Sequence, residues 1–286
     1  MSKLLKRFVV AFVLLGIVLL LLFLSTFSQI FFDIFLYALA LIAMLEIYGA
    51  TVRAGYKPPK VAIITAAVLT YPLSFLMDTR GVLFALAIAF AVGFIDFVFS
   101  RKMTFTDFTV SIFVIIYPFL FFGLAFSLNN AFGLMPLLVA LFAAVGTDIF
   151  AFFVGSAFGS RGIKVFPSIS PKKTLQGFIG GLAGGVLGAL FAYGVFEKLG
   201  FPANVRMRFS EAFANPILVV SLIGLIVAPI AEIGDLAASR VKRELGIKDY
   251  GHLLGEHGGV MDRLDSILFS LFLMAVFMYF VYPAVA

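Results

Sequence analysis

The stretch GDLAASRVKRELGIKDYGHLLGEHGGVMDRLDS, residues 234–266, is a polar island in an apolar chain. It carries both histidines of the protein, five of its lysines and arginines, and six of its acids. Four glycines lie between Lys248 and Val260. Because 63% of the whole chain is hydrophobic, this concentration of charge separates the last two apolar segments and indicates a functional region between them.

The composition of the rest predicts an all-α, polytopic integral membrane protein. Only 13% of the 286 residues are charged, whereas a soluble domain has about 25% charged residues. Mean hydropathy is +1.14, and apolar runs long enough to cross a bilayer as helices recur along the chain. A transmembrane barrel would alternate polar and apolar residues instead. The absence of cysteine excludes disulfides and thiol catalysis.

The apolar runs predict nine transmembrane helices. The first follows a basic start and is interpreted as a retained span, not a cleaved signal. The expected spans lie at about 8–24, 30–49, 61–77, 81–99, 108–128, 134–155, 177–197, 214–237 and 266–285. We expect residues 1–130 to hold spans one to five. Residues 131–286 are expected to form the catalytic region, spans six to nine with the loops 156–176 and 238–265.

The distribution of cations tests this count and sets an orientation. With the N-terminus in the cytoplasm, 17 of the 21 lysines and arginines fall in cytoplasmic segments, as the positive-inside rule requires. The net charge of +6 has the same origin in this interpretation. We therefore expect a protein of the cytoplasmic (inner) membrane, with its active site facing the cytoplasm.

Five acids lie inside apolar runs, near the cytoplasmic ends of their spans: Glu46, Asp96, Asp148, Glu232 and Asp235. A charged side chain at the centre of a bilayer costs about 2.5–3.5 kcal/mol on insertion scales. For Glu46 and Asp96 the sequence favours an interfacial position or a hydrogen bond between helices. The polar neighbours of the other three favour a functional role.

Two pairs of acids share a spacing of three residues, Glu232 with Asp235 and Asp262 with Asp265. Such a spacing places both members on one face of a helix. Oxygen ligands of this kind suit a hard cation such as Mg²⁺. Zinc is disfavoured because the chain lacks cysteine, so the two histidines are expected to bond a phosphate or a carboxylate.

A second polar segment, SISPKKTLQG at residues 168–177, has the features of an anion site. Ser170-Pro171 predicts a turn and the start of a helix, and a helix N-terminus attracts anions. The alternative is that the two lysines only follow the positive-inside rule. The glycines between 177 and 188 predict close helix packing, and no P-loop sequence is present.

The polar stretch resembles the signature of the phosphatidate cytidylyltransferase (CDP-diacylglycerol synthase) family. That signature reads S-x-x-K-R-x-x-x-x-K-D, then H-G-G-x-x-D-R-x-D, and is matched here from Ser239 to Asp249 and from His257 to Asp265. Residues 170–177 resemble a second region of the family pattern, and Asp148 stands where the family has an acid. The chain departs from the pattern at Gly255-Glu256, where the family has Pro-Gly.

This resemblance implies that CTP and phosphatidic acid give CDP-diacylglycerol and pyrophosphate. It implies a Mg²⁺ cofactor, with a second metal or a monovalent cation left open. The expected metal ligands are Asp235, Asp262 and Asp265, with Glu232 and Asp148. The expected catalytic residues are Asp235, Asp262, Asp265, Lys248 and Arg263. The expected substrate-binding residues are Ser170, Lys172, Lys173, Thr174, Ser239, Lys242, Arg243, His252, His257, Gly258 and Gly259.

The partners implied are CTP and phosphatidic acid in the bilayer, without nucleic acid, and a homodimer is an open alternative to a monomer. Two other functions stay open at this point. A CTP-dependent polyprenol or phytol kinase would also join a cytidine nucleotide to a membrane lipid. A cation-coupled transporter would carry ions on its membrane-embedded acids, although acids at mid-bilayer depth would suit it better than acids near the cytoplasmic end.

Overall fold

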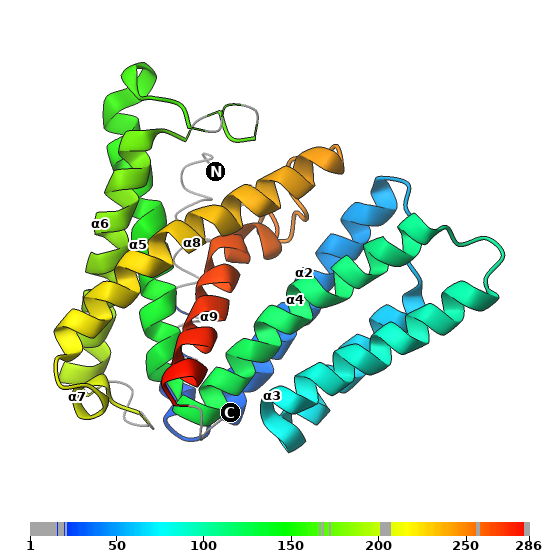
Figure 1. The fold of residues 1–286 in the computed structure, drawn as a ribbon, viewed down its shortest axis with the longest axis horizontal. Helices are drawn as coiled ribbons and strands as arrows, with labels where there is room; N and C mark the ends of the chain where they lie inside the picture. The colour runs from blue at the N-terminus through cyan, green and yellow to red at the C-terminus, as the bar shows by residue number, and fades with distance from the viewer. Residues whose placement is uncertain are drawn as a thin grey trace. The chain divides into compact units, whose positions relative to one another are not determined.

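The computed structural model describes residues 16, 20, 22–165, 167, 169–171, 173–200, 207–255 and 258–282. Its α-helices are α2 (Ile30–Arg53), α3 (Lys60–Phe99), α4 (Phe105–Phe132), α5 (Leu134–Phe158), α6 (Leu175–Ala192), α7 (Phe209–Ala212), α8 (Pro216–Glu244) and α9 (Met261–Val281). Figure 1 shows their course. A short 3₁₀ turn, Gly159–Arg161, follows α5, and a π-helix, Tyr193–Lys198, continues α6.

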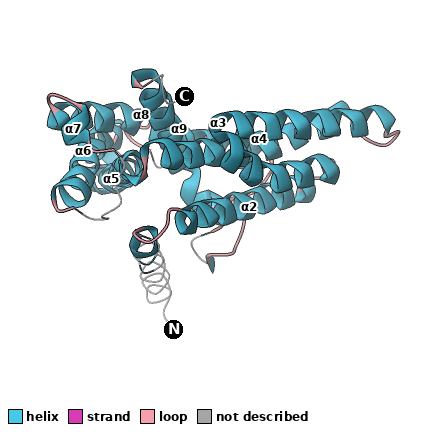
Figure 2. Ribbon diagram, turned by 90° about the horizontal axis from the view of Figure 1, so that it is seen from below, coloured by secondary structure: helices cyan, strands magenta, loops and turns pink. Residues whose placement is uncertain are grey.

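The described residues contain no β-strand, only an isolated bridge between Lys164 and Thr174. Figure 2 accordingly shows helices joined by loops. Seven of the described helices are long and apolar enough to cross a membrane. The prediction of an all-α, polytopic membrane protein is therefore confirmed. The count of nine stays a prediction, because most of the first expected span lies outside the described residues.

The 40 residues of α3 form a helical hairpin with two arms. Asp78 has φ 51° and ψ −134°, a conformation that breaks the helix. The chain reverses there so tightly that a Cβ on Gly81 would lie 1.8 Å from the Leu73 carbonyl oxygen. Farther along, a Cβ on Gly93 would lie 2.9 Å from the Ala62 methyl group. The predicted division between residues 77 and 81 therefore corresponds to a real turn.

The chain divides into two compact units, each described here by itself. The first contains Met1–Asn130 and Glu244–Arg263, and the second contains Ala131–Arg243 and Leu264–Ala286. The polar segment that follows α8 thus belongs to the same unit as the N-terminal helices. In the first unit, α3 touches α4 where a Cβ on Gly123 would meet the Val82 side chain at 2.5 Å.

The helices around the polar stretch are longer than the sequence predicted. α8 continues to Glu244, and α9 begins at Met261, so the connection is shorter than the expected loop 238–265. Hydropathy falls where the chain leaves the apolar core, but helical hydrogen bonding does not have to stop there. Lys242 and Arg243 in the last turn of α8 also favour the helix, because cations stabilise the C-terminal end of its dipole.

The start of α6 lies four residues later than Ser170-Pro171, which the sequence predicted as the helix start. Ser170 begins the predicted turn, and its carbonyl oxygen accepts the backbone N–H of Lys173 at 3.2 Å. The N-cap is Thr174, whose Oγ1 accepts the backbone N–H of Gly177 at 3.0 Å. This cap gives a hydrogen-bond acceptor to a backbone N–H group that would otherwise have no partner in the first turn of the helix. Lys173 therefore stands just outside the helix.

Glycines let α6 approach its neighbours at backbone distance, as the spacing predicted. A Cβ on Gly184 would lie 2.3 Å from the Gly146 carbonyl oxygen in α5, and a Cβ on Gly188 would lie 2.0 Å from that of Phe142. On another face of α6, a Cβ on Gly185 would lie 2.6 Å from the Gly224 carbonyl oxygen in α8. Small residues permit this contact because no side chain separates the backbones.

We expect Gly184→Ala to lower the thermal stability of the purified protein. The added methyl group would meet the Gly146 oxygen and, at 2.6 Å, the Phe150 Cβ, and overpacking of this kind costs about 1–3 kcal/mol. Gly194→Ala is the matched control, since a Cβ there meets nothing within 4 Å. Equal melting temperatures for the two variants would contradict the close packing of α5 and α6.

Candidate functional site

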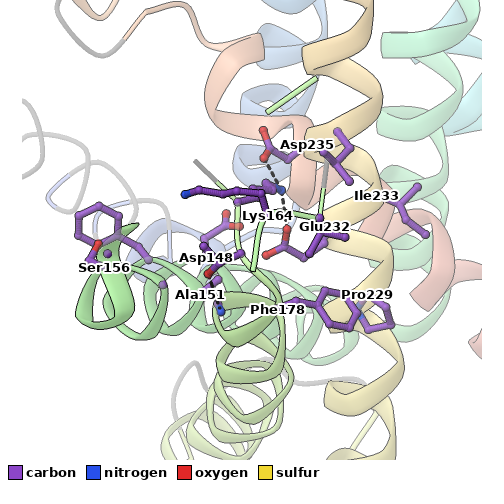
Figure 3. A pocket seen from close by; sticks show the side chains of 17 residues that line it. Asp148, Ala151, Ser156, Lys164, Phe178, Pro229, Glu232, Ile233 and Asp235 are labelled. Atoms are coloured by element: carbon purple, nitrogen blue, oxygen red, sulfur yellow. Dashed lines mark hydrogen bonds and ion pairs between the residues drawn. The ribbon is translucent and has the colours of Figure 1, made fainter. Parts of the chain in front are cut away.

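A lysine held between two carboxylates forms the centre of the candidate site in the second unit. The Lys173 Nζ lies 2.5 Å from Glu232 Oε2 and 2.6 Å from Asp235 Oδ2. Both acids belong to α8, one turn apart on the same face. Figure 3 shows them with the dashed lines that mark these ion pairs. The Glu232 side chain is only 9% exposed, so the contact is largely withdrawn from water.

The protonation of Lys173 follows from its surroundings. Burial alone lowers the pKa of its ammonium, but the charges of Asp235 and Glu232 outweigh burial and raise the pKa above its ordinary value of 10.5. Lys173 therefore stays a cation at any pH near neutrality, and its charge is fixed where the two acids hold it.

Two more acids approach this centre from other helices of the same unit. Ser266 at the start of α9 donates its hydroxyl to Asp148 Oδ2 in α5 at 2.9 Å, and its backbone N–H to Asp265 Oδ1 at 2.9 Å. Lys242 Nζ lies 3.9 Å from Asp265 Oδ2. The charge of Asp235 acts on both Asp148 and Asp265. We call this set of acids the carboxylate cluster: Asp148, Glu232, Asp235 and Asp265.

A cavity of about 670 Å³ lies beside the carboxylate cluster. Its polar lining includes Lys173 and three of the four acids, Asp148, Glu232 and Asp235, and most of its remaining wall is apolar or glycine. Small-molecule sites have volumes of about 300–1,000 Å³ and this kind of lining, apolar with a few polar groups that converge. The cavity is therefore large enough for a nucleotide.

Sequence reasoning missed two polar residues of this cavity, Lys164 and Ser156. Lys164 reaches the site because the loop after α5 folds back, so that Lys164 forms a β-bridge with Thr174. Its only signal in the sequence was its place among the cations of the expected loop 156–176. No spacing rule identifies Ser156.

The donor chemistry of the carboxylate cluster fits the predicted Mg²⁺, because hard cations prefer oxygen ligands. Within the part of the chain that the structure describes, however, no three acid or histidine side chains converge closely enough to hold one ion. Glu232 and Asp235 instead share the Lys173 ammonium. Binding a metal through both acids would therefore require Lys173 to move.

We call the connection between Glu244 and Met261 the signature loop, and it is arranged around Asp262 in the first unit. Asp262 Oδ2 accepts the backbone N–H groups of Tyr250 at 2.8 Å and Gly259 at 3.0 Å. Asp262 is 7% exposed and Tyr250 is fully buried. Gly258 has φ +81°, and a Cβ there would lie 3.2 Å from Asp262 Oδ2. The loop thus closes over the carboxylate, with glycine where the backbone approaches it.

The other predicted residues have varied surroundings. Arg243, Lys248, His252 and Arg263 are exposed, and Ser170 and Ser239 are partly buried. The backbone N–H of Gly258 donates to the Gly255 carbonyl oxygen, so the amides of both predicted glycines are engaged within the loop. Lys172 and His257 lie outside the described residues. The role of each of these residues stays a prediction.

Comparison with known proteins places this geometry in context. The chain matches the cytidylyltransferase family over residues 5–281. It is 32% identical to the phosphatidate cytidylyltransferase of Aquifex aeolicus over 180 residues, which are 63% of this chain and 61% of that protein. Identity to the Bacillus subtilis enzyme of the same name is 35% over 152 residues, or 52% and 50% of the two chains. Identity to the phosphatidate cytidylyltransferase of Brucella abortus is 40% over 141 residues, which are 49% of this chain and 46% of that protein.

The matched part thus spans between 46% and 61% of the length of these relatives. The family match is broader, because it includes the N-terminal helices, the carboxylate cluster and the signature loop. Since it extends over nearly the whole chain, this protein belongs to the cytidylyltransferase family.

Proposed function

We propose that the protein transfers the cytidylyl group of CTP to phosphatidic acid, giving CDP-diacylglycerol and pyrophosphate. One observation carries the proposal: a half-buried lysine between two carboxylates lines a cavity of nucleotide size. Three relatives named phosphatidate cytidylyltransferase support the choice of lipid. The exposed apolar residues of the helices suit a substrate that resides in the bilayer.

The reaction exchanges one phosphorus–oxygen bond for another. An oxygen of the phosphatidate phosphate forms a bond to the α-phosphorus of CTP. The bond from that phosphorus to the oxygen bridging it to the β-phosphorus breaks, and pyrophosphate leaves with this oxygen. The two substrates are both polyanions, so the main barrier is their repulsion, and fixed positive charge lowers it. No covalent intermediate on the protein is required.

Lys173 and Lys164 supply positive charge at the wall of the cavity. We assign Lys173 to the phosphates of the substrates, because Glu232 and Asp235 fix its position before any substrate binds. The carboxylate cluster would hold Mg²⁺ once Lys173 has moved from between Glu232 and Asp235 toward the phosphates; when bound, the ion supplies charge that screens the phosphates and stabilises the leaving group. The family resemblance implies Asp262 as a further metal ligand, and this role stays a prediction.

We further propose that the site faces the cytoplasm at the inner membrane, where CTP is available. The basis is the asymmetry of lysine and arginine, 17 of 21 on one side in the expected topology. CTP and phosphatidic acid are the proposed partners, and a homodimer in the membrane is an open alternative to a monomer.

Purified protein with Mg²⁺, phosphatidic acid and CTP labelled at the α-phosphorus should transfer the label to an organic-extractable lipid. With the label at the γ-phosphorus, radioactivity should appear in pyrophosphate and stay in the aqueous phase. This pairing identifies cytidylyl transfer, because only the α-phosphorus is retained in CDP-diacylglycerol.

Diacylglycerol replaces phosphatidic acid in the control, since it lacks the attacking phosphate oxygen and should give no labelled lipid. A lipid kinase would produce the reverse pattern, with γ-label in the lipid and α-label in aqueous CDP. Cation uptake by proteoliposomes without nucleotide turnover would indicate a transporter. Either result would contradict the proposed function.

A further inference from the structure

The N-terminal end of α9 is capped by an acid from a distant helix. Glu46 of α2 accepts the Val260 N–H on Oε1 at 3.0 Å and the Met261 N–H on Oε2 at 2.8 Å. The first turn of a helix leaves its backbone N–H groups without partners, and a cap usually comes from the residue just before the helix. Here more than 200 residues of chain separate the cap from the helix, although both belong to the first unit.

The signature loop is shaped to fit this carboxylate. A Cβ on Gly251 would lie 2.3 Å from Glu46 Oε1, and a Cβ on Gly259 would lie 2.3 Å from Glu46 Oε2. Both distances are far below van der Waals contact, so no other residue fits at either position while Glu46 keeps its place. Loop backbone therefore packs directly against the Glu46 carboxylate at two separate points.

A second residue of α2 holds the other end of the loop. Arg53 Nη2 donates to the Tyr250 carbonyl oxygen at 2.8 Å, and the Tyr250 N–H donates to Asp262 Oδ2 at 2.8 Å. Arg53 follows Glu46 by seven residues, about two helical turns, so both side chains leave the same face of α2. The Asp262 carboxylate is thus fixed through Tyr250 by Arg53, and through the start of α9 by Glu46.

From these contacts we infer that Glu46 and Arg53 are positioning residues, which set the place of Asp262 by holding the signature loop along its backbone. The inference rests on the proposed function for its consequence in catalysis. Neither residue has to touch substrate. An error of about 1 Å in the placement of a catalytic group can cost up to about 100-fold in rate. Without the contacts of Glu46 and Arg53 the loop would keep its sequence, but the protein would lose activity.

Kinetics of Glu46 variants in the full-length protein test the inference. Glu46→Ala should lower kcat by about 10- to 100-fold while the KM values for CTP and phosphatidic acid change by less than about threefold. Glu46→Gln should be intermediate, because its one amide oxygen can still accept an N–H. Asp96→Asn is the matched control, another acid of a membrane-spanning helix, and should stay near wild type. A kcat for Glu46→Ala within about twofold of wild type would overturn the inference.

A double substitution tests the contact itself. Gly251→Ala should be strongly impaired, because its methyl group and the Glu46 carboxylate cannot occupy the same space. Adding Glu46→Ala removes that conflict, so the double variant should lose much less than the product of the two single losses. Multiplicative losses would show that Gly251 and Glu46 act independently and would overturn the inference.

Amide hydrogen exchange gives a readout that does not depend on activity. In Glu46→Ala, the amides of residues 260 and 261 should exchange faster, while those of α6 keep their wild-type rates. If exchange is faster in Glu46→Ala but the wild-type protein forms no CDP-diacylglycerol, the proposed function is refuted. The inference that Glu46 holds the loop would then still stand. Unchanged exchange at 260 and 261 would refute the anchoring, whatever the activity.

Discussion

Replacement of Lys173 with methionine should abolish formation of CDP-diacylglycerol, with kcat/KM reduced by at least about 1,000-fold. The substitution removes the cation held against Glu232 and Asp235, and with it the charge we assign to the substrate phosphates. Loss of a single preorganised donor to developing negative charge already costs about 100- to 1,000-fold in kcat. The measurement is labelled-lipid formation from α-labelled CTP, at saturating phosphatidic acid.

The same substitution is expected to destabilise the protein, because it leaves the buried Glu232 and the half-buried Asp235 without their counter-ion. Breaking a buried ion pair by removing one partner costs about 3–5 kcal/mol. Stability and chemistry can be separated with the double variant Lys173→Met/Glu232→Gln, which removes one charge of each sign. We expect it to recover thermal stability and to stay inactive.

Lys198→Met is the matched control for this prediction. It is the same change at the far end of the α6 segment, where Lys198 is exposed and lies 5.6 Å from the centre of the Tyr193 ring. Its activity should stay near wild type. Substantial activity in the stable double variant would mean that Lys173 serves folding alone, and the assignment to phosphate binding would be wrong.

The pH dependence of the reaction should not arise from Lys173. Although burial opposes the charge, the neighbouring carboxylates raise its pKa above 10.5. A raised pKa means that the stabilisation is complete below the unfolded-state pKa and is lost only as the pH rises through the folded value. Across about pH 6 to pH 9, a range below the ordinary lysine pKa, the stability supplied by this contact should be constant.

Sequence alone predicted the features that depend on neighbours along the chain. Apolar runs located the helices, the polar Asp78–Gly81 segment located the hairpin turn, and the glycines of α6 predicted close helix packing without indicating the partner helix. The pairing of Glu232 with Asp235 follows from helical periodicity, which is local geometry. In each case the signal lies in the residues of the element itself.

Contacts between distant segments were beyond the reach of the sequence. The sequence favoured an interfacial or helix–helix role for Glu46, and gave the N-terminal region little weight in the site. Its carboxylate accepts the backbone N–H groups of residues 260 and 261. Backbone N–H groups do not depend on residue type, so a sequence pattern could not reveal these two donors. Helix ends were misplaced for a related reason, since hydropathy records where apolar residues stop and not where hydrogen bonding stops.

Asp262→Asn is expected to eliminate activity while largely preserving the signature loop. An asparagine oxygen can still accept the N–H groups of Tyr250 and Gly259, which now bond Asp262 Oδ2. The negative charge is lost, however, and with it the contribution we propose to Mg²⁺ binding. We expect kcat/KM to fall by at least about 1,000-fold, measured over a range of Mg²⁺ concentrations.

Asp262→Ala separates the two roles of this side chain. It removes both acceptors, so the amides of residues 250 and 259 should exchange much faster than in Asp262→Asn. If Asp262→Asn is inactive with wild-type exchange at these amides, the charge itself is required. If both amides are fully deprotected in Asp262→Asn, its inactivity reflects a disordered loop.

Asp235→Asn extends the test to the carboxylate cluster of the second unit. Asp235 bonds Lys173, so its loss should also inactivate the protein and should raise the Mg²⁺ concentration needed for any residual activity. Near-normal turnover in both Asp235→Asn and Asp262→Asn would refute the assignment of these acids to the metal. That outcome would also remove the reason for a loss of kcat in the Glu46 variants, whereas the hydrogen-exchange test of the loop contacts would still stand.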